Sequence, residues 1–225
     1  GKAVFIDAAL PGEEVEFLYT EIRRDYAEAR VVKVLTPTED RVEPLCPHFD
    51  VCGGCSFQHV DSATQIQIKQ GLLEEQFKRI GKITIPELWE PLMGPHWGYR
   101  RKARMGVKYV AKKNRVLVGF REKRNPYLAE MDNCIVMHPI VGTKLVSLGE
   151  MIAGLSIRDK IPQIEVAIGD EQCALAIRVL EPPTADDQEQ MRTFGKAHNL
   201  TLCLQSKGPD TIVPLDGEPE VIPTY

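Results

Sequence analysis

The sequence predicts an α+β fold, in which a partial β-barrel precedes a domain with a mainly antiparallel sheet. Three segments rich in β-forming residues lie within the first 40 residues, and a proline-punctuated linker follows them. From about residue 99 the chain alternates apolar and polar residues along two neighbouring segments. Helical and extended patterns then follow one another towards the C-terminus, and runs of this kind indicate an α+β domain.

The first 40 residues predict three short strands. The segments AVFI, EVEFLYTE and EARVVKVL are rich in β-forming residues and are interrupted by LPGEE and IRRDY. Three strands are too few to close a barrel by themselves, but they would supply part of a small OB-like barrel. We therefore expect residues 1–40 to form an incomplete β-barrel.

A loop and a helix are expected next. The stretch 46–59, CPHFDVCGGCSFQH, shows no periodicity and contains two adjacent glycines, which predicts a sharply bent loop. Ser62 with Gln65 three residues later is typical of a capping box, so a helix should begin there and end near Gly81. The expected apolar face of this helix consists of Ile66, Leu73, Phe77 and Ile80.

Two strands of a hairpin are predicted beyond residue 99. Within ARMGVKYV, Met105 and Val107 should point inward, while Arg104 and Lys108 should point outward. The segment RVLVGF repeats this alternation after AKKN, which suits a hairpin turn. The tail DGEPEVIPTY is expected to form no folded element. The remaining predicted elements are a helix near 141–154, strands at 163–168 and 172–180, a helix at 184–198 capped by Thr184, and a strand at 200–205.

The charge distribution indicates a polyanion-binding surface. The net charge is −4, which alone argues against a nucleic-acid-binding protein. Residues 100–124, however, contain eleven lysines and arginines against the single acid Glu122, and the remainder holds 17 basic and 31 acidic residues. A solvated sheet face with ion pairs would also explain such a run. Because its members lie on one side of alternating strands, we favour contact with RNA.

The cysteine spacing indicates a metal centre. Cys46, Cys52 and Cys55 form a tight C-x5-C-x2-C trio, in which the Gly-Gly pair should allow positive φ and expose backbone N–H groups to sulfur. A fourth ligand must come from elsewhere. Cys134 lies in the irregular segment MDNCIVMHP and is the best candidate, whereas Cys173 and Cys203 lie in apolar strand patterns typical of buried structural thiols.

Two kinds of centre remain open on this reasoning. A close trio of cysteines with one distant partner favours a [4Fe–4S] cluster. A zinc site is the alternative, with four cysteines or with His48 or His59 completing a Cys3His set. A set of buried thiols without any ligand is the least favoured interpretation for so tight a trio.

These residues resemble a known family. The run CPHFDVCGGCSFQH, the helix after it, GYRRKAR at 98–104, GFR at 119–121 and then Cys134 resemble, in order and spacing, the RNA uracil-5-methyltransferases that modify large-subunit ribosomal RNA. The opening GKAVFIDAALPGE resembles the second half of the TRAM domain of that family. The resemblance covers nearly the whole chain, and the cysteine loop is its most specific part.

The resemblance implies an enzyme of which this chain is one part. In the family, a TRAM domain and a central iron–sulfur domain precede a catalytic domain that uses S-adenosylmethionine. There a cysteine attacks C6 of a flipped-out uridine and the methyl group goes to C5. This sequence contains no Gly-rich cofactor loop and no nucleophile motif of the family. We therefore expect the N-terminal and central part of such an enzyme, inactive by itself, with S-adenosylmethionine bound only by the full-length protein.

Specific residues and domains follow from the resemblance. It implies a partial TRAM domain at 1–40, a central iron–sulfur domain at 41–57 and 90–225, and a helix at 58–89 that docks on the methyltransferase domain. The last arginine of the basic strand, Arg104, should face the RNA substrate. The implied cluster ligands are Cys46, Cys52, Cys55 and Cys134. The candidate RNA-contacting residues are Tyr99, Arg100, Arg101, Lys102, Arg104, Lys108 and Arg121.

Other features of the sequence limit where the protein is located and what it binds. No run of about 18 apolar residues is present, so no membrane span is expected, and the first residues do not form a signal peptide. We expect a cytoplasmic, monomeric RNA-binding protein with ribosomal RNA as its partner. Two rival functions remain: a zinc- or cluster-stabilised RNA-binding module without enzyme activity, and a ferredoxin-like electron carrier that would not need the basic segment.

Overall fold

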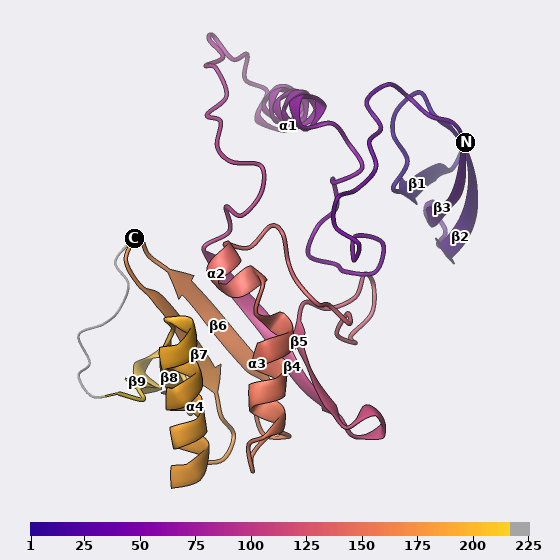
Figure 1. Ribbon diagram of the computed structural model, residues 1–225. Helices are drawn as coiled ribbons and strands as arrows, with labels where there is room; N and C mark the ends of the chain where they lie inside the picture. The colour runs from indigo at the N-terminus through magenta and orange to yellow at the C-terminus, as the bar shows by residue number, and fades with distance from the viewer. Residues whose placement is uncertain (217–225) are drawn as a thin grey trace. The chain divides into compact units, whose positions relative to one another are not determined.

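The computed structural model describes residues 1–216, and these form two compact units (Figure 1). The first unit contains residues 1–49 and 55–93, and the second contains residues 50–54 and the chain from residue 94 onward. The functional domain boundaries at residues 40, 57 and 89 remain a prediction. The predicted tail DGEPEVIPTY lies, after Asp216, outside the described residues.

The first unit begins with a three-stranded sheet. Strands β1 (Ala3–Asp7), β2 (Glu14–Ile22) and β3 (Tyr26–Thr36) confirm the three predicted extended segments. The strand order is β1-β3-β2, with β1 parallel and β2 antiparallel to β3. A positive φ at Gly12 turns the chain between β1 and β2. Whether this sheet is part of a barrel remains a prediction.

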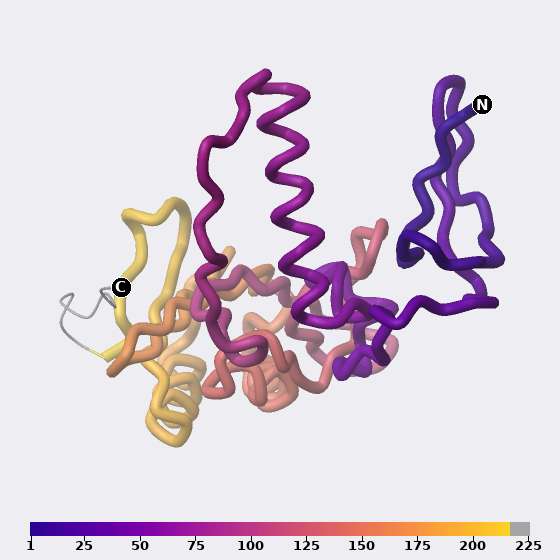
Figure 2. The backbone as a smooth tube through the Cα atoms, turned by 90° about the horizontal axis from the view of Figure 1, so that it is seen from above, coloured from indigo at the N-terminus to yellow at the C-terminus, as the bar shows by residue number. Residues whose placement is uncertain are grey.

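A helix follows the cysteine loop in the first unit. Helix α1 covers Ser62–Gln76, and one π-helical turn, Phe77–Gly81, continues it. The predicted cap at Ser62 is wrong by one residue, because the side chain of Asp61 accepts hydrogen bonds from the backbone of Ala63 and Thr64. Figure 2 shows α1 as a long helix, after which the chain turns back. No residue of α1 is buried: of the predicted apolar face, Ile66 is half-buried, and Leu73, Phe77 and Ile80 are exposed.

The second unit is built on a six-stranded sheet with the order β5-β4-β6-β7-β8-β9. All of its neighbouring strands are antiparallel except β7 and β8, which confirms a mainly antiparallel sheet. The predicted hairpin between β4 and β5 turns through a short 3₁₀ segment, Ala111–Lys113, and Asn114 at positive φ. The strands are β4 (Lys102–Val110), β5 (Arg115–Gly119), β6 (Gln163–Ile168), β7 (Cys173–Arg178), β8 (Thr201–Gln205) and β9 (Ile212–Pro214).

Helices cover one face of this sheet. Figure 1 shows α3 (Leu145–Ala153) and α4 (Ala185–His198) lying on the same side of the strands. The helix predicted near 141–154 is divided, because the short α2 (Pro139–Gly142) ends before α3 begins. Thr184 caps α4 in a full capping box with Asp187. Apolar residues of α3 and of the strands, including Leu148, Ile152 and Ile164, form the buried core.

A membrane-crossing helix is not found in the described part of the chain, since each helix there is too short or too polar.

Candidate nucleic-acid interface and cysteine loop

The two faces of strand β4 differ sharply in character. Met105 and Val107 are buried, whereas Lys102, Arg104 and Lys108 are exposed. Val107 pairs with Val118 of β5, against which α3 packs so closely that a Cβ at Gly149 would lie 2.6 Å from the carbonyl oxygen of Val116. Because successive side chains alternate between faces, the three basic residues lie on the side away from the helices. This side is called the helix-free face below.

Arg104 is held in position by the neighbouring strand. It lies opposite Glu165 of β6, and its Nη2 is 3.0 Å from Oε1 of that residue. The same carboxylate accepts a hydrogen bond from Nε2 of Gln163 at 2.9 Å. The Arg104 side chain nevertheless remains 70% exposed. Exposed ion pairs contribute little free energy, about 0–1 kcal/mol, so a phosphate could replace this partner at small cost.

The other predicted RNA-contacting residues surround this face or lie apart from it. Arg101 donates to the carbonyl oxygen of Gly169 at 2.9 Å and pairs with Asp170 at 3.1 Å, so its guanidinium is bound to the loop between β6 and β7. Tyr99 is exposed and Arg100 is half-buried, in the segment that precedes β4. Arg121 is exposed beyond the end of β5. The structure therefore places only Lys102, Arg104 and Lys108 together on one face.

Sequence reasoning missed two polar partners on the helix-free face. Glu165 and Arg178 occupy the same face of β6 and β7 by strand alternation and register. Arg178 is half-buried and donates to the carbonyl oxygen of Lys207 at 3.0 Å. The alternation in QIEVAI does expose Glu165 as a polar position, but only the register of β4 with β6 reveals that it faces Arg104.

A basic loop lies over part of the same face. Gly106 pairs with Gly119 on β5, and a Cβ at Gly106 would lie 2.6 Å from Cδ2 of Leu128. A Cβ at residue 106 would require the Leu128 side chain to move, so this glycine allows the loop of residues 120–130 to approach β4 closely.

Within the second unit, the segment around Cys52 is bound to the chain that follows β5. The backbone N–H of Gly53 donates to Arg121 at 2.8 Å, and that of Lys123 donates to Val51 at 2.8 Å. The predicted positive φ at the glycine pair is wrong, because neither glycine has it. Gly53 is instead needed for close approach, since a Cβ there would lie 3.1 Å from the Arg121 carbonyl oxygen.

The surroundings of the Cys52 sulfur suit a thiolate that serves as a metal ligand. Cys52 is buried, and its Sγ accepts a hydrogen bond from the backbone N–H of Gly54 at 3.4 Å. Such N–H donors stabilise negative charge on sulfur, as the ligands of iron–sulfur clusters require. Cys134, also in the second unit, is buried, and its backbone N–H donates to Gly142 at 2.8 Å.

The other two predicted ligands belong to the first unit. Cys46 is buried and Cys55 is half-buried. The backbone N–H of Cys46 donates to Oε1 of Gln58 at 3.3 Å, and its carbonyl oxygen accepts from Phe49 at 3.1 Å. Among the residues that the structure describes, no group of three or more His, Cys, Asp or Glu side chains is placed to hold a metal ion. A shared centre thus remains a prediction, although the buried sulfurs and the N–H donor fit one.

Cys173 and Cys203 behave as structural thiols. Both are buried in strands β7 and β8. Burial raises the pKa of the Cys173 thiol to about 11 and also raises the pKa of Cys203. Both side chains therefore stay protonated near neutral pH, as the apolar strand patterns indicated.

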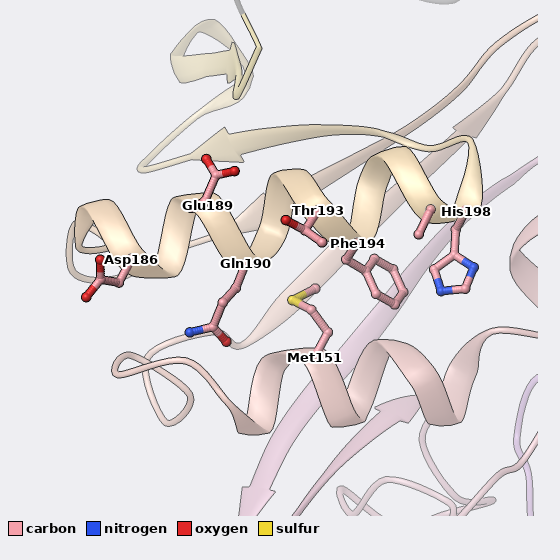
Figure 3. Close-up of a pocket in the computed structure, with 8 residues that line it drawn as sticks. Met151, Asp186, Glu189, Gln190, Thr193, Phe194 and His198 are labelled. Carbon is pink, nitrogen blue, oxygen red and sulfur yellow. The ribbon is translucent and has the colours of Figure 1, made fainter.

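A pocket of about 710 Å³ lies between α3 and α4. Figure 3 shows Met151 of α3 pointing towards α4, with Phe194 and His198 side by side. Asp186 and Glu189 bring negative charge to its rim. An acidic pocket on the helix-covered face does not suit a polyanion, so the helix-free face is the better candidate for RNA.

Comparisons with known proteins agree with the resemblance in the sequence. The chain is 50% identical over 215 residues to a protein of Methylococcus capsulatus named 23S rRNA (uracil(1939)-C(5))-methyltransferase RlmD, covering 96% of this chain and 48% of that protein. A protein of the same name from Nitrosococcus oceani is 53% identical over 214 residues, covering 94% of this chain and 48% of the relative. The chain thus spans about half the length of the curated relatives it matches.

The fold also has a counterpart among solved structures. The crystal structure of Pyrococcus abyssi tRNA (uracil-54, C5)-methyltransferase in complex with S-adenosyl-L-homocysteine aligns with a TM-score of 0.61. The alignment covers 94% of this chain and 49% of that one, at 17% identity, which shows similarity of fold. No protein-family model matches the chain. By sequence, the chain matches about half the length of proteins named 23S rRNA (uracil(1939)-C(5))-methyltransferase, over nearly all of its own residues.

Proposed function

We propose that this chain is the RNA-binding and iron–sulfur portion of an S-adenosylmethionine-dependent ribosomal RNA uracil-C5-methyltransferase. The observation that carries the proposal is identity of about half of the residues, across nearly the whole chain, with relatives of that name. The helix-free face supplies the matching physical property, a basic surface on an otherwise acidic chain. The target is ribosomal RNA in the cytoplasm, and the chain acts as a monomer.

The basic residues of β4 bind the RNA backbone. Lys102, Arg104 and Lys108 project from one face of β4, with intervals of two and four residues between them. This spacing suits contacts with successive phosphates. Tyr99 is exposed and offers a ring on which an unpaired base can stack. Arg104, already oriented by Glu165, is the residue we place nearest the modified nucleotide.

Binding to an RNA fragment at several salt concentrations tests this surface. The double variant Arg104→Ala and Lys108→Ala should bind about tenfold more weakly or worse, and the slope of log affinity against log salt should fall by about 1 per lost phosphate contact. Lys196→Ala on α4 removes one positive charge from the helix-covered face and is the control, to be compared with each single variant as well as with the double variant. Identical binding curves for the parent, the double variant and the control would refute the proposed interface.

Cys46, Cys52, Cys55 and Cys134 hold a [4Fe–4S] cluster in this proposal. The burial of Cys46, Cys52 and Cys134 and the N–H donated to Sγ of Cys52 support it. The cluster has a structural role, since closing the chain between residue 55 and residue 134 constrains the unfolded state. S-adenosylmethionine, bound by the full-length protein, would supply the methyl group.

Anaerobic preparation followed by iron and sulfide analysis tests the cluster. We expect iron and sulfide in the parent, their loss in Cys52→Ser together with a lower melting temperature, and their retention in Cys173→Ser. RNA affinity should change less than the melting temperature in Cys52→Ser. An unchanged iron content and melting temperature in Cys52→Ser would contradict the ligand assignment.

The same measurements separate the rival functions. Zinc without iron or sulfide would favour the zinc-stabilised module. Reversible redox cycling without RNA affinity would favour an electron carrier. The identity to methyltransferases favours the main proposal over both.

The exposed residues of α1 and the segment after it dock on the methyltransferase domain in this proposal. Leu73, Phe77 and Ile80 are exposed on the helix and its last turn, and Trp89 and Leu92 are exposed beyond it. Amide exchange in α1 should therefore be slower in the full-length protein than in this chain. Equal exchange rates would contradict docking. We further expect no methyl transfer to RNA from this chain alone.

A further inference from the structure

Gln58 follows the cysteine loop and is joined to one of the proposed ligands. Its Oε1 accepts a hydrogen bond from the backbone N–H of Cys46 at 3.3 Å. A backbone N–H can only donate, so the oxygen of the amide must be the atom that faces Cys46. The orientation of the amide is therefore settled by chemistry, and Nε2 faces away from this contact.

The other end of the amide needs an acceptor. Nε2 of Gln58 is buried and has no hydrogen-bond partner among the described residues. Buried donors are almost always satisfied, so an unsatisfied one indicates a partner that is an ion, a cofactor or an ordered water. Gln65 in the same unit shows the usual outcome, because its Nε2 donates to the carbonyl oxygen of Val60 at 3.0 Å.

We propose that Gln58 is a positioning residue for the cluster, with Oε1 fixing the backbone at Cys46 and Nε2 donating to a cluster or thiolate sulfur. This inference rests on the proposed function, which supplies the cluster. Sulfur carries negative charge and accepts N–H donors, and such hydrogen bonds raise the reduction potential of iron–sulfur centres. A buried water is the alternative acceptor. In that case the potential and the stability of the cluster would not depend on this side chain.

Two substitutions isolate the donated hydrogen bond. Gln58→Glu keeps an oxygen for Cys46 but replaces the donor by a negative charge. Gln58→Met removes both the oxygen and the donor without adding charge. The loss of the N–H donor is the one change that the two variants share. Gln67→Glu adds the same charge at an exposed position of α1 and serves as the control.

The protein is prepared without oxygen, and two properties are measured on each variant: the midpoint potential, and the rate at which visible absorbance is lost in air. Both Gln58 variants should show a more negative potential and a severalfold faster loss of the cluster, while Gln67→Glu matches the parent. Either Gln58 variant matching the parent in both properties would overturn the inference. A parent that contains no iron would instead overturn the proposed cluster, so the two failures are distinguishable.

Circular dichroism of the same samples distinguishes a local effect from unfolding. A native spectrum with faster cluster loss supports the positioning role. If Gln58→Met unfolds while Gln58→Glu is native and matches the parent, only the contact to Cys46 matters and the donated bond is refuted.

Discussion

Helix α1 and strand β4 both carry alternating apolar and polar residues, but they place their apolar residues in opposite environments. In β4, Met105 and Val107 are buried, and the charged residues face outward. In α1 no residue is buried, and the following segment leaves Trp89 82% exposed. The sheet of the second unit therefore buries a core of large apolar residues, whereas Leu73, Trp89 and Leu92 of the first unit are exposed.

This difference teaches that burial, rather than apolar composition, determines where stability resides. A buried side chain contributes by leaving water and by filling space, and an exposed one contributes neither. Large exposed apolar groups gathered in one region are typical of surfaces that meet a partner. The comparison can be tested by substitutions in each region, in order of decreasing expected effect.

The largest effect should come from the core of the second unit. Met105 is fully buried, and Met105→Ala should lower the free energy of unfolding by about 3 kcal/mol through lost burial and the remaining cavity. Urea denaturation followed by circular dichroism measures this. Leu92→Ala, at a fully exposed position, is the control. Equal losses of unfolding free energy in the two variants would contradict the distinction between the buried core of the second unit and the exposed segment of the first.

A polar contact in the same unit should rank second. Burial alone would raise the pKa of the Asp187 carboxyl, but hydrogen bonds from Ser156 and Thr184 outweigh it and lower the pKa to about 2. Asp187→Ala should therefore destabilise by about 2 kcal/mol at neutral pH. The folded-state pKa is depressed, so the stabilisation is present above the usual value of 3.8 and is lost as pH falls towards 2.

Melting curves from pH 7 to pH 2 check this prediction. The difference between parent and Asp187→Ala should shrink continuously below about pH 4. Asp186→Ala removes an exposed acid from the same helical turn and is the matched control. A difference that stays constant down to pH 2 would show that the ionised carboxylate is not what stabilises α4.

An ion pair in the first unit should have a smaller effect. The hydrogen bond from Arg41 lowers the pKa of Glu13 to about 2, and the Arg41 Nη2 to Glu13 Oε2 distance is 2.7 Å. Glu13→Gln should cost about 1 kcal/mol at pH 7. This loss should disappear as pH falls from 4.5 towards 2, whereas the exposed Glu14→Gln should cost little at any pH.

The smallest effect should come from the segment after α1. Trp89→Ser should change the free energy of unfolding by less than about 0.5 kcal/mol, because the indole is already in water. Urea denaturation of this chain measures it. A loss of 2 kcal/mol or more would mean that the tryptophan packs against this chain, contrary to the proposed docking surface.

Local patterns in the sequence predicted most elements of this fold. Alternation revealed β4 and β5, and the capping residue Thr184 marked the start of α4, because both signals depend only on neighbouring residues. Strand β9 escaped notice because three residues are too few for a pattern. The cap of α1 was misplaced because Asp61 and Ser62 are both good capping residues, and only the geometry selects Asp61.

The candidate site was predictable in part for the same reason. The outward direction of Arg104 and Lys108 followed from alternation, but the pairing of Arg104 with Glu165 depends on the register of strands 61 residues apart. The half-buried position of Arg100 and the binding of Arg101 to the β6–β7 loop likewise depend on distant segments. Long-range register is not encoded in any short stretch of sequence.

Photo-crosslinking of a bound ribosomal RNA fragment, followed by mass spectrometry of the attached peptides, tests the central claim most directly. Crosslinks should concentrate in residues 99–110, with Lys102 and Lys108 on the helix-free face among the modified positions. Crosslinks confined to α3 and α4, with none in β4, would contradict the account.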